Sequence, residues 1–190
     1  MLSGCEDFLD TENLTKKDNS SFPKTENDAN AALTGVYAIL REMTPGEDGQ
    51  SFFMTAEILS DDRFGGGGPD DKRMHAVDRL KKVDEDMFAD VWKQDYRAIY
   101  RSNMLLECMD DIKWTSEENH NKIEGQTRFL RAYFYFDLCR LFGTVPLIVA
   151  TEPVNNPRTT ADELYAQIAT DLKLAIEKLP AKRYNPSETA

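Results

Sequence analysis

The hydrophobic pattern of the chain predicts a succession of helices. Apolar residues recur at spacings of three and four in several stretches, which is the periodicity of amphipathic helices. Two stretches begin with a threonine that has an acidic residue three positions later, the arrangement of a capping box. The sequence therefore predicts helices over Thr25 to Met43, Ser51 to Leu59, Asp86 to Asp111, Ser116 to Phe142 and Thr160 to Leu179.

Four of these helices are predicted to have one apolar face each. Their apolar positions lie about one helical turn apart, so each helix needs a neighbour on that side. The predicted faces are Ala29, Ala32, Leu33, Val36, Tyr37, Leu40 and Met43 in the first helix, Phe52, Phe53, Ala56 and Leu59 in the second, Phe88, Val91, Trp92, Tyr96, Ile99, Asn103 and Leu106 in the third, and Leu164, Tyr165, Ile168, Leu172, Ala175, Ile176 and Leu179 in the last.

The fourth predicted helix differs because its apolar residues lie on every side. Six of the fourteen residues from Phe129 to Phe142 are aromatic, and aromatic side chains remove the most apolar surface from water. A helix that is apolar all round is a buried helix. Gly143 supplies a left-handed residue to end it, Pro146 prevents its continuation, and Val145 to Val149 is predicted to be extended.

Short connections between long helices predict antiparallel helical hairpins. We therefore expect an all-α fold of tetratricopeptide-like helical hairpins, with minor extended segments. Residues 1–24 are predicted to be a tether, and residues 25–190 the N-terminal part of a helical repeat domain. Because Asn185 to Ala190 looks like the opening of another helix, we expect a piece of something longer.

Composition narrows the function by exclusion. The formal net charge is −11, whereas a nucleic-acid partner requires clustered lysine and arginine, so no nucleic acid is expected to bind, and a polyanionic ligand is disfavoured in the same way. The odd count of three cysteines does not indicate a disulfide framework. Apolar residues make up 41% of the chain, which suffices for a core, but none of the apolar runs approaches the length of a membrane span.

No pattern typical of catalysis is present in the sequence. Adjacent acidic pairs such as Asp61-Asp62 are as frequent as an acidic chain produces by chance, and the glycine run lacks the spacing of a nucleotide-binding loop. His75 and His120 lie far apart without metal-ligand spacing, so each is predicted to be a surface residue. We expect no enzyme activity, no cofactor and no metal.

The first residues have the form of a bacterial lipobox. Small residues precede Cys5 in Leu2-Ser3-Gly4-Cys5, and cleavage before this cysteine would leave it as a lipidated N-terminus. The charged and apolar regions of a secretory signal do not precede it in this sequence. Lipidation of Cys5 is the hypothesis, and an ordinary cysteine in a frayed terminus is the alternative.

Several motifs together resemble one family. The aromatic helix reads FLRAYFYFDLCRLFG and is followed by TVPL, and this combination resembles the signature of the SusD/RagB family of surface glycan-binding lipoproteins. The lipobox, the ALTGVY run from Ala32, the Ser60-Asp61-Asp62 stretch, and Trp92 with Tyr96, Ile99 and Asn103 match the family in the same order. So does the helix from Leu164 to Pro180.

The resemblance implies a lipid-anchored protein at the cell surface of the outer membrane. It implies capture of a glycan and delivery to a TonB-dependent, SusC-like transporter, without catalysis. Family members are several hundred residues long, so this chain would cover their first third to half. Two alternatives stay open: a family member that binds peptide or another nutrient, and a helical scaffold that binds only protein.

The stretch Ser60 to Asp84 has no helical periodicity and is the predicted ligand-binding loop. Loops of this length are usually functional or disordered, and a floppy loop without function is the alternative. Its four glycines permit close approaches that side chains block, and its aromatic, guanidinium and carboxylate groups suit a neutral sugar. The candidate ligand-binding residues are Asp61, Asp62, Arg63, Phe64, Gly65, Gly66, Gly67, Gly68, Asp70 and Asp71.

Overall fold

The structure, a computed structural model, describes residues 23–42, 52–60, 62–81, 88–152 and 155–181. The predicted all-α class is confirmed, and the only strand-like pairs among these residues are two isolated bridges, Thr25 with Lys113 and Pro146 with Arg158. None of the described helices is both long and apolar enough to cross a membrane. The helices are α1 (Glu26–Glu42), α2 (Phe52–Leu59), α3 (Lys72–Asp78), α4 (Ala89–Glu107), the 3-10 helix η2 (Met109–Asp111), α5 (Glu117–Phe142) and α6 (Ala161–Lys178).

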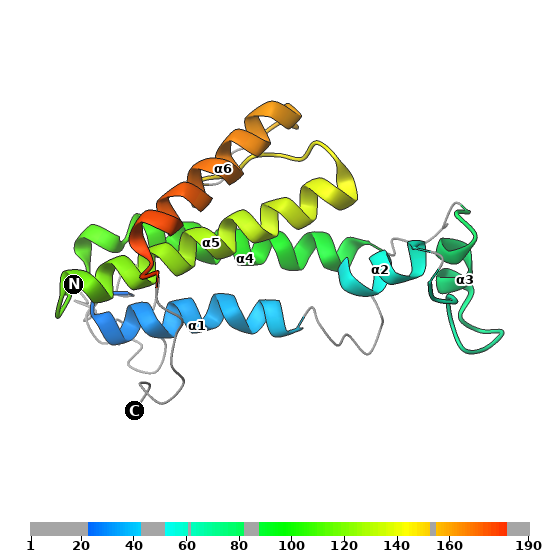
Figure 1. Ribbon diagram of the computed structural model, residues 1–190, viewed down its shortest axis with the longest axis horizontal. Coiled ribbons are helices and arrows are strands. Elements are labelled where there is room, and N and C mark those ends of the chain that lie inside the picture. The colour runs from blue at the N-terminus through cyan, green and yellow to red at the C-terminus, as the bar shows by residue number, and fades with distance from the viewer. Residues whose placement is uncertain (1–22, 43–51, 61, 82–87, 153–154, 182–190) are drawn as a thin grey trace, which may run out of the picture.

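Helix α5 is the centre of the molecule. It packs against α1, α4 and α6, and Figure 1 shows α4 alongside it, α1 below and α6 crossing above at an angle. Helices α2 and α3 lie together at the far end of the molecule, next to the start of α4. The predicted hairpin of α4 and α5 is therefore present, and the signature helix is the one that α1, α4 and α6 all contact.

The helix ends follow the predicted local signals. The backbone N–H of Asp28 donates to Thr25 Oγ1 at 3.2 Å, while Thr25 N–H donates to the Asp28 carboxylate at 3.1 Å. Thr160 and Glu163 form the second capping box, and hydrogen bonds from Thr159 and Thr160 lower the pKa of Glu163 to about 2. Gly143 ends α5 with the positive φ that the sequence predicted, 70°, but its ψ of −122° lies outside the left-handed helical region.

The core forms around the aromatic part of α5. Phe134, Tyr135, Leu130 and Leu138 are fully buried, which confirms the predicted core helix. The prediction that this helix is buried on all sides is nevertheless wrong at Phe129 and Phe136, which are 45% and 38% exposed. Among the described residues no helix covers that part of α5, because α1, α4 and α6 occupy its other sides.

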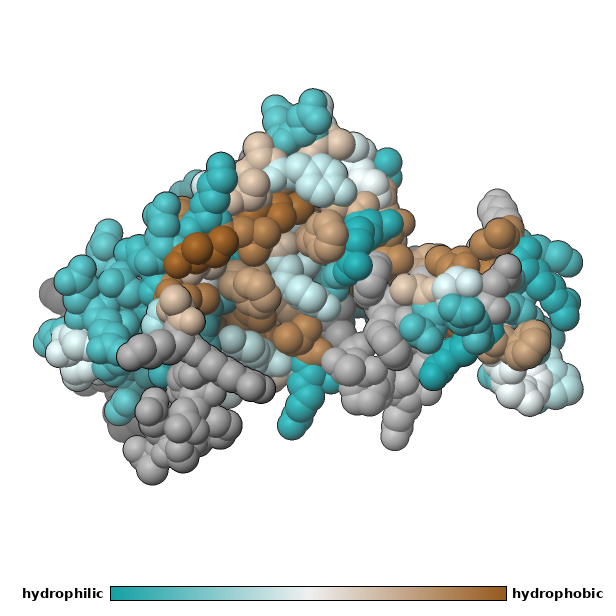
Figure 2. Space-filling model, viewed as in Figure 1, coloured by the Kyte–Doolittle hydropathy of each residue, from teal (hydrophilic) through white to brown (hydrophobic). Residues whose placement is uncertain are grey.

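Two predicted apolar faces are only partly buried. In α2, Leu59 is exposed and its neighbour Ile58 is buried instead, whereas the side chains of the predicted face residues Phe52 and Phe53 lie outside the described part of the structure. In α6, Ile168 and Ala175 pack inward, whereas the outer positions reach the surface and Ile176 is 77% exposed. Apolar side chains are accordingly visible on the face shown in Figure 2. The reason is that α6 is an edge helix in the described structure, so a neighbour covers only one side of it. The predicted face residues Tyr165 and Leu172 also reach the surface.

The stretch Ser60 to Asp84 is not one irregular loop, because it contains α3. Ile58 and Val77 form a second small core between α2 and α3, with Met74 and Phe88 packed against it. The short helix escaped the sequence pattern because Met74 and Val77 alone provide its apolar side, and two positions define no periodicity.

Candidate ligand-binding site

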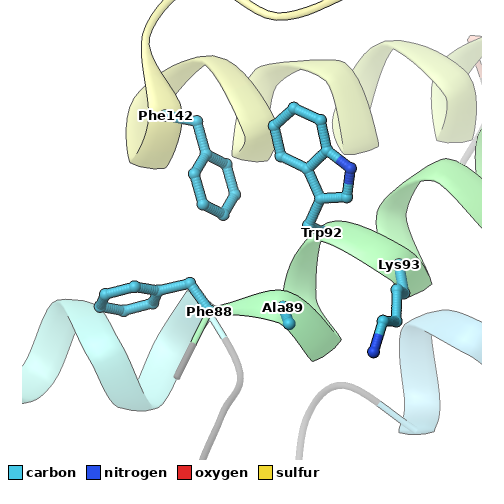
Figure 3. A pocket seen from close by; sticks show the side chains of 5 residues that line it. All are labelled: Phe88, Ala89, Trp92, Lys93 and Phe142. Carbon is cyan, nitrogen blue, oxygen red and sulfur yellow. The ribbon is translucent and has the colours of Figure 1, made fainter. Parts of the chain in front are cut away.

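A pocket lined mainly by aromatic side chains lies where α4 begins and α5 ends. Its volume is about 220 Å³, and its lining residues are Phe88, Ala89, Trp92, Lys93 and Phe142 (Figure 3). Since α4 and α5 are antiparallel, the first turn of one helix and the last turn of the other meet at the same end of the hairpin. The pocket therefore combines residues that are fifty positions apart in the sequence.

The rings of this pocket hold one another in edge-to-face contacts. The Trp92 and Phe142 ring centroids are 5.1 Å apart at 84°, and those of Phe88 and Phe142 are 6.4 Å apart at 82°. Tyr96 lies 4.9 Å from Trp92, and its hydroxyl donates to the carbonyl of Pro146 at 2.7 Å. Edge-to-face aromatic pairs are favourable, so the pocket walls are preorganised.

Phe88 joins the two cores of the molecule. It packs against the small core of Ile58 and Val77, and its ring also contacts Phe142 at the end of α5. Figure 3 shows it between α2 and the pocket. The α2–α3 segment is therefore attached to the main body at the wall of the aromatic pocket.

The side chains that line this pocket are suited to binding a sugar rather than to catalysing a reaction. Trp92 and Phe142 can offer apolar ring surface to a sugar ring, and Lys93 adds a largely exposed ammonium, 3.7 Å from Asp90, that can donate to hydroxyl groups. The only side chain of the lining that could act as a nucleophile or base is Lys93, and its ammonium is largely exposed and paired with Asp90. The arrangement therefore supports binding rather than chemistry.

The predicted ligand-binding residues lie on the α2–α3 segment, outside this pocket. Asp62, Arg63 and Phe64 are exposed, and Phe64 has 92% of its surface accessible. Arg63 forms an exposed ion pair with Glu57 at 3.6 Å. Asp70 is also exposed, and Asp61 lies outside the described residues.

Two of the four glycines make the close approaches that the sequence predicted, but their partner is α3. A Cβ atom on Gly65 would lie 2.2 Å from the Met74 carbonyl oxygen. Gly66 has a φ of +82°, and its Cβ atom would lie 2.4 Å from Cβ of Asp71. Gly67 and Gly68 have open space, and their N–H groups donate to the Asp71 carboxylate at 2.7 and 3.1 Å. Gly65, Gly66 and Asp71 thus hold the turn against α3.

Replacing Gly66 by alanine should loosen the α3 segment, because the new Cβ atom would clash with Asp71 and the backbone conformation disfavours L side chains. We expect a cost of about 1 to 3 kcal/mol in local stability, measured by hydrogen exchange of the α3 amides. Gly68→Ala is the matched control, since its Cβ atom meets nothing within 4 Å. Equal exchange rates in the two variants would contradict this role.

Both histidines, which the sequence predicted to be surface residues, are partly exposed. His75 is half-buried, and its Nε2 lies 3.0 Å from the Gly68 carbonyl oxygen. His120 is also half-buried and packs edge-to-face on Trp114, with ring centroids 5.0 Å apart. Across the described ranges no cluster of three metal-ligating side chains occurs.

The charged residues inside the signature helix form a buried network. Arg131 donates two hydrogen bonds to Asp171 of α6, at 2.7 and 2.8 Å, and one to Asn103 of α4 at 2.8 Å. Asn103 in turn donates to the carbonyl of Ile148 at 2.9 Å, and Tyr135 hydrogen-bonds the same residue. The network fixes three helices and the extended segment, so the signature is structural.

Sequence reasoning missed the aromatic pocket because it assigned the lining residues to buried faces. Phe88 and Trp92 were placed on the apolar side of α4, and Phe142 in the core helix. All three are only partly buried. The available signal was positional: an aromatic residue in the first turn of one helix and in the last turn of its antiparallel partner.

The chain is similar to known proteins over almost its whole length. Residues 7–190 match a family named SusD-like and described as starch-binding associating with outer membrane. SusD-like proteins P25 and P2 of Formosa agariphila are 28% identical over 185 residues and 30% identical over 171 residues, which cover 90% and 87% of this chain. These matches cover 34% and 33% of the relatives, so the chain spans about a third of their length.

Solved structures show the same fold. A laminarin binding SusD-like protein superposes with a TM-score of 0.75 and 27% identity, covering 88% of this chain and 37% of that one. Surface glycan-binding protein A from Bacteroides uniformis superposes with a TM-score of 0.74 and 26% identity, covering 86% and 37%.

Proposed function

Because the chain belongs to the SusD-like family, we propose that it is the N-terminal part of a cell-surface lipoprotein that binds glycans. The observation that supports this function most directly is the aromatic pocket between Phe88, Trp92 and Phe142. Its rings present apolar surface at a concave place, which is how a protein binds a neutral sugar ring without charge.

The proposal includes the partners that the resemblance implied. The protein captures an oligo- or polysaccharide at the outer membrane, is held there by lipid on Cys5, and delivers the glycan to a SusC-like transporter. Binding occurs without catalysis and without a cofactor. Residues 1–24 serve as the tether, and residues 25–190 are the first part of a longer helical repeat domain.

The exposed residues of the α2–α3 segment extend the proposed site beyond the pocket. Phe64 has almost its whole ring in solvent, an unfavourable place for a phenylalanine unless a partner covers it. Asp62, Arg63 and Asp70 are exposed on the same segment and offer polar groups for sugar hydroxyls.

Phe64→Ala is expected to weaken glycan binding about tenfold while the melting temperature stays within about 1 °C, because an exposed side chain contributes little to folding. Calorimetry with soluble starch and laminarin measures the affinity, with Arg63→Ala as a second variant. Ile176→Ala is the matched control, because Ile176 is an exposed apolar residue of α6, 77% accessible and outside the proposed site. Unchanged affinity in both site variants would place the site elsewhere, and absence of binding to any glycan would overturn the proposed function.

Cys5 is expected to carry the lipid anchor, although it lies outside the described residues. Expressed behind a lipoprotein signal peptide in a Gram-negative host, the chain should incorporate labelled fatty acid. Cys5→Ala should abolish this labelling, whereas Cys108→Ala, at a half-buried free thiol, should leave it intact. Labelling that persists in the Cys5 variant would refute the anchor.

A further inference from the structure

A second pocket, on α3, has basic walls. Its volume is about 260 Å³, and it is lined by Lys72, His75, Ala76, Arg79 and Lys81. Three of the five lining residues carry a positive charge, although the chain as a whole has a net charge of −11. The electrostatic potential at this pocket is therefore positive, although the protein as a whole is negatively charged.

The basic and the acidic side chains of the α3 segment lie on different sides of the helix. Lys72, Ala76 and Arg79 are spaced by four and three residues, so they share the face that lines the pocket. Two acidic residues lie toward the glycine turn: the Asp71 carboxylate accepts from Gly67 and Gly68, and Cβ of Asp78 lies beside Gly65. Neither of them lines the basic pocket.

A reversal at the end of α3 brings the third cation to the pocket. The N–H of Lys81 donates to the Ala76 carbonyl at 2.8 Å, and that of Leu80 donates to Val77 at 2.9 Å. These are the two hydrogen bonds of a Schellman motif, whose left-handed position is usually glycine. Here Leu80 occupies it with a φ of 51°. Leu80 thus keeps a backbone conformation that is unfavourable for leucine. The turn that it makes places Lys81 beside Ala76.

Among the described residues, the cations of this pocket have no carboxylate partner. Within the part of the chain that the structure describes, Lys72, Arg79 and Lys81 form no ion pair, in contrast to Arg63 with Glu57 and Arg131 with Asp171. His75 adds rigidity, since its ring hydrogen-bonds the Gly68 carbonyl. Unpaired guanidinium and ammonium groups that converge on a concave surface are the usual means of binding an anionic oxygen group.

We propose that the pocket on α3 binds an anionic substituent, a carboxylate or a sulfate ester, of an acidic glycan. This inference rests on the proposed glycan-binding function and narrows its ligand class. The volume is below the roughly 300 Å³ at which pockets for drug-sized ligands begin, so it suits one charged sugar unit of a longer chain. The aromatic pocket then contacts uncharged sugar rings, and the basic pocket selects for the charge.

Calorimetry of the 190-residue chain with matched polymers tests the proposal. Dextran sulfate and polygalacturonate provide the sulfate ester and the carboxylate, and dextran, starch and laminarin are uncharged. The pocket variant is the double substitution Arg79→Gln and Lys81→Gln, at exposed positions. Its matched control is Lys113→Gln with Lys173→Gln, which removes the same charge from exposed positions elsewhere. Lys72→Gln is an independent single variant.

We expect the pocket variant to lose about tenfold or more in affinity for at least one acidic polymer, which identifies the preferred group, with less than a twofold change in the control. Affinity for an uncharged glycan should stay the same in both. Equal losses in the two double variants would overturn the proposal, because net charge alone would then explain binding. The proposal would also be overturned if the chain bound inorganic sulfate as tightly as it binds the acidic polymer.

The remaining outcomes separate this inference from the proposed function. If the parent chain binds starch or laminarin but neither acidic polymer, the basic pocket has a different role and the glycan-binding function stands. If it binds none of the polymers, the proposed function fails and the inference fails with it.

Discussion

Replacing Asp171 by leucine should lower the free energy of unfolding by about 3 to 5 kcal/mol, because it leaves the Arg131 guanidinium buried without its counter-ion. Asp171 is fully buried and Arg131 is 5% exposed, and two hydrogen bonds of 2.7 and 2.8 Å join them. Arg128 also donates to Asp171 at 3.2 Å, so two cations lose a partner. Urea denaturation followed by circular dichroism measures the change.

An exposed ion pair provides the control for Asp171. Arg97 and Glu42 lie 3.9 Å apart with about half of each side chain accessible, so Glu42→Gln should cost less than about 1 kcal/mol. The double variant Arg131→Met with Asp171→Leu should recover much of the loss, since apolar residues of similar volume often replace a buried pair without cost. A cost for Asp171→Leu no larger than that of Glu42→Gln would contradict the structural role of the network.

Replacing Asp95 by asparagine should make the protein more stable at neutral and alkaline pH. Asp95 is fully buried on α4, and among the described residues neither of its carboxylate oxygens has a hydrogen-bond partner. Burial, together with the nearby charge of Asp137, raises the pKa of Asp95 to about 8. Asp137 itself is paired with Arg140, and burial raises its pKa as well.

The direction of the pH effect follows from where the proton is held. In the unfolded chain Asp95 titrates near its ordinary pKa of 3.8, whereas in the folded protein it keeps its proton up to about pH 8. Its contribution to stability is therefore fully present below about pH 4 and is lost as the pH rises to about 8. The loss is about 1.4 kcal/mol for each pH unit in this window.

The measurement is the difference between the two stability curves. Relative to the parent, Asp95→Asn should show a gain that grows from pH 4 to pH 8 and reaches a few kcal/mol, because the amide need not ionise. Asp90→Asn, at an exposed position on the same helix, is the control and should follow the parent. A constant difference between parent and Asp95→Asn across this range would show that Asp95 is not buried as a neutral acid.

The helix ends and the core helix are the parts of the fold that local sequence patterns predicted well. The helix starts at Thr25, Ser116 and Thr160 and the positive φ at Gly143 are all present. Each depends on residues within four positions of one another or on the conformation of a single residue. Such interactions have the same partners whatever the rest of the chain does, so the sequence contains all the information they need.

Burial was predicted less well wherever it depends on which neighbour is present. The apolar stripe of α6 was visible in the sequence, yet Ile168 is covered and Ile176 is not. The same holds for Phe129 and Phe136, which lie on a side of α5 that no described helix covers. A periodic pattern identifies apolar positions, but it does not say how many sides of a helix will receive a partner.

For the candidate site, too, some features followed from the sequence and others only from the tertiary structure. The sequence by itself determined that this is a chain of helices organised around one aromatic helix, with a glycine-rich segment whose backbone approaches something closely. Only the tertiary structure decided that Gly65 and Gly66 approach α3, that Phe88, Trp92 and Phe142 meet at one pocket, and that Lys72, Arg79 and Lys81 converge on another. Helix type and helix ends follow from interactions over a few residues, whereas a pocket is made by residues that come together only when the helices pack.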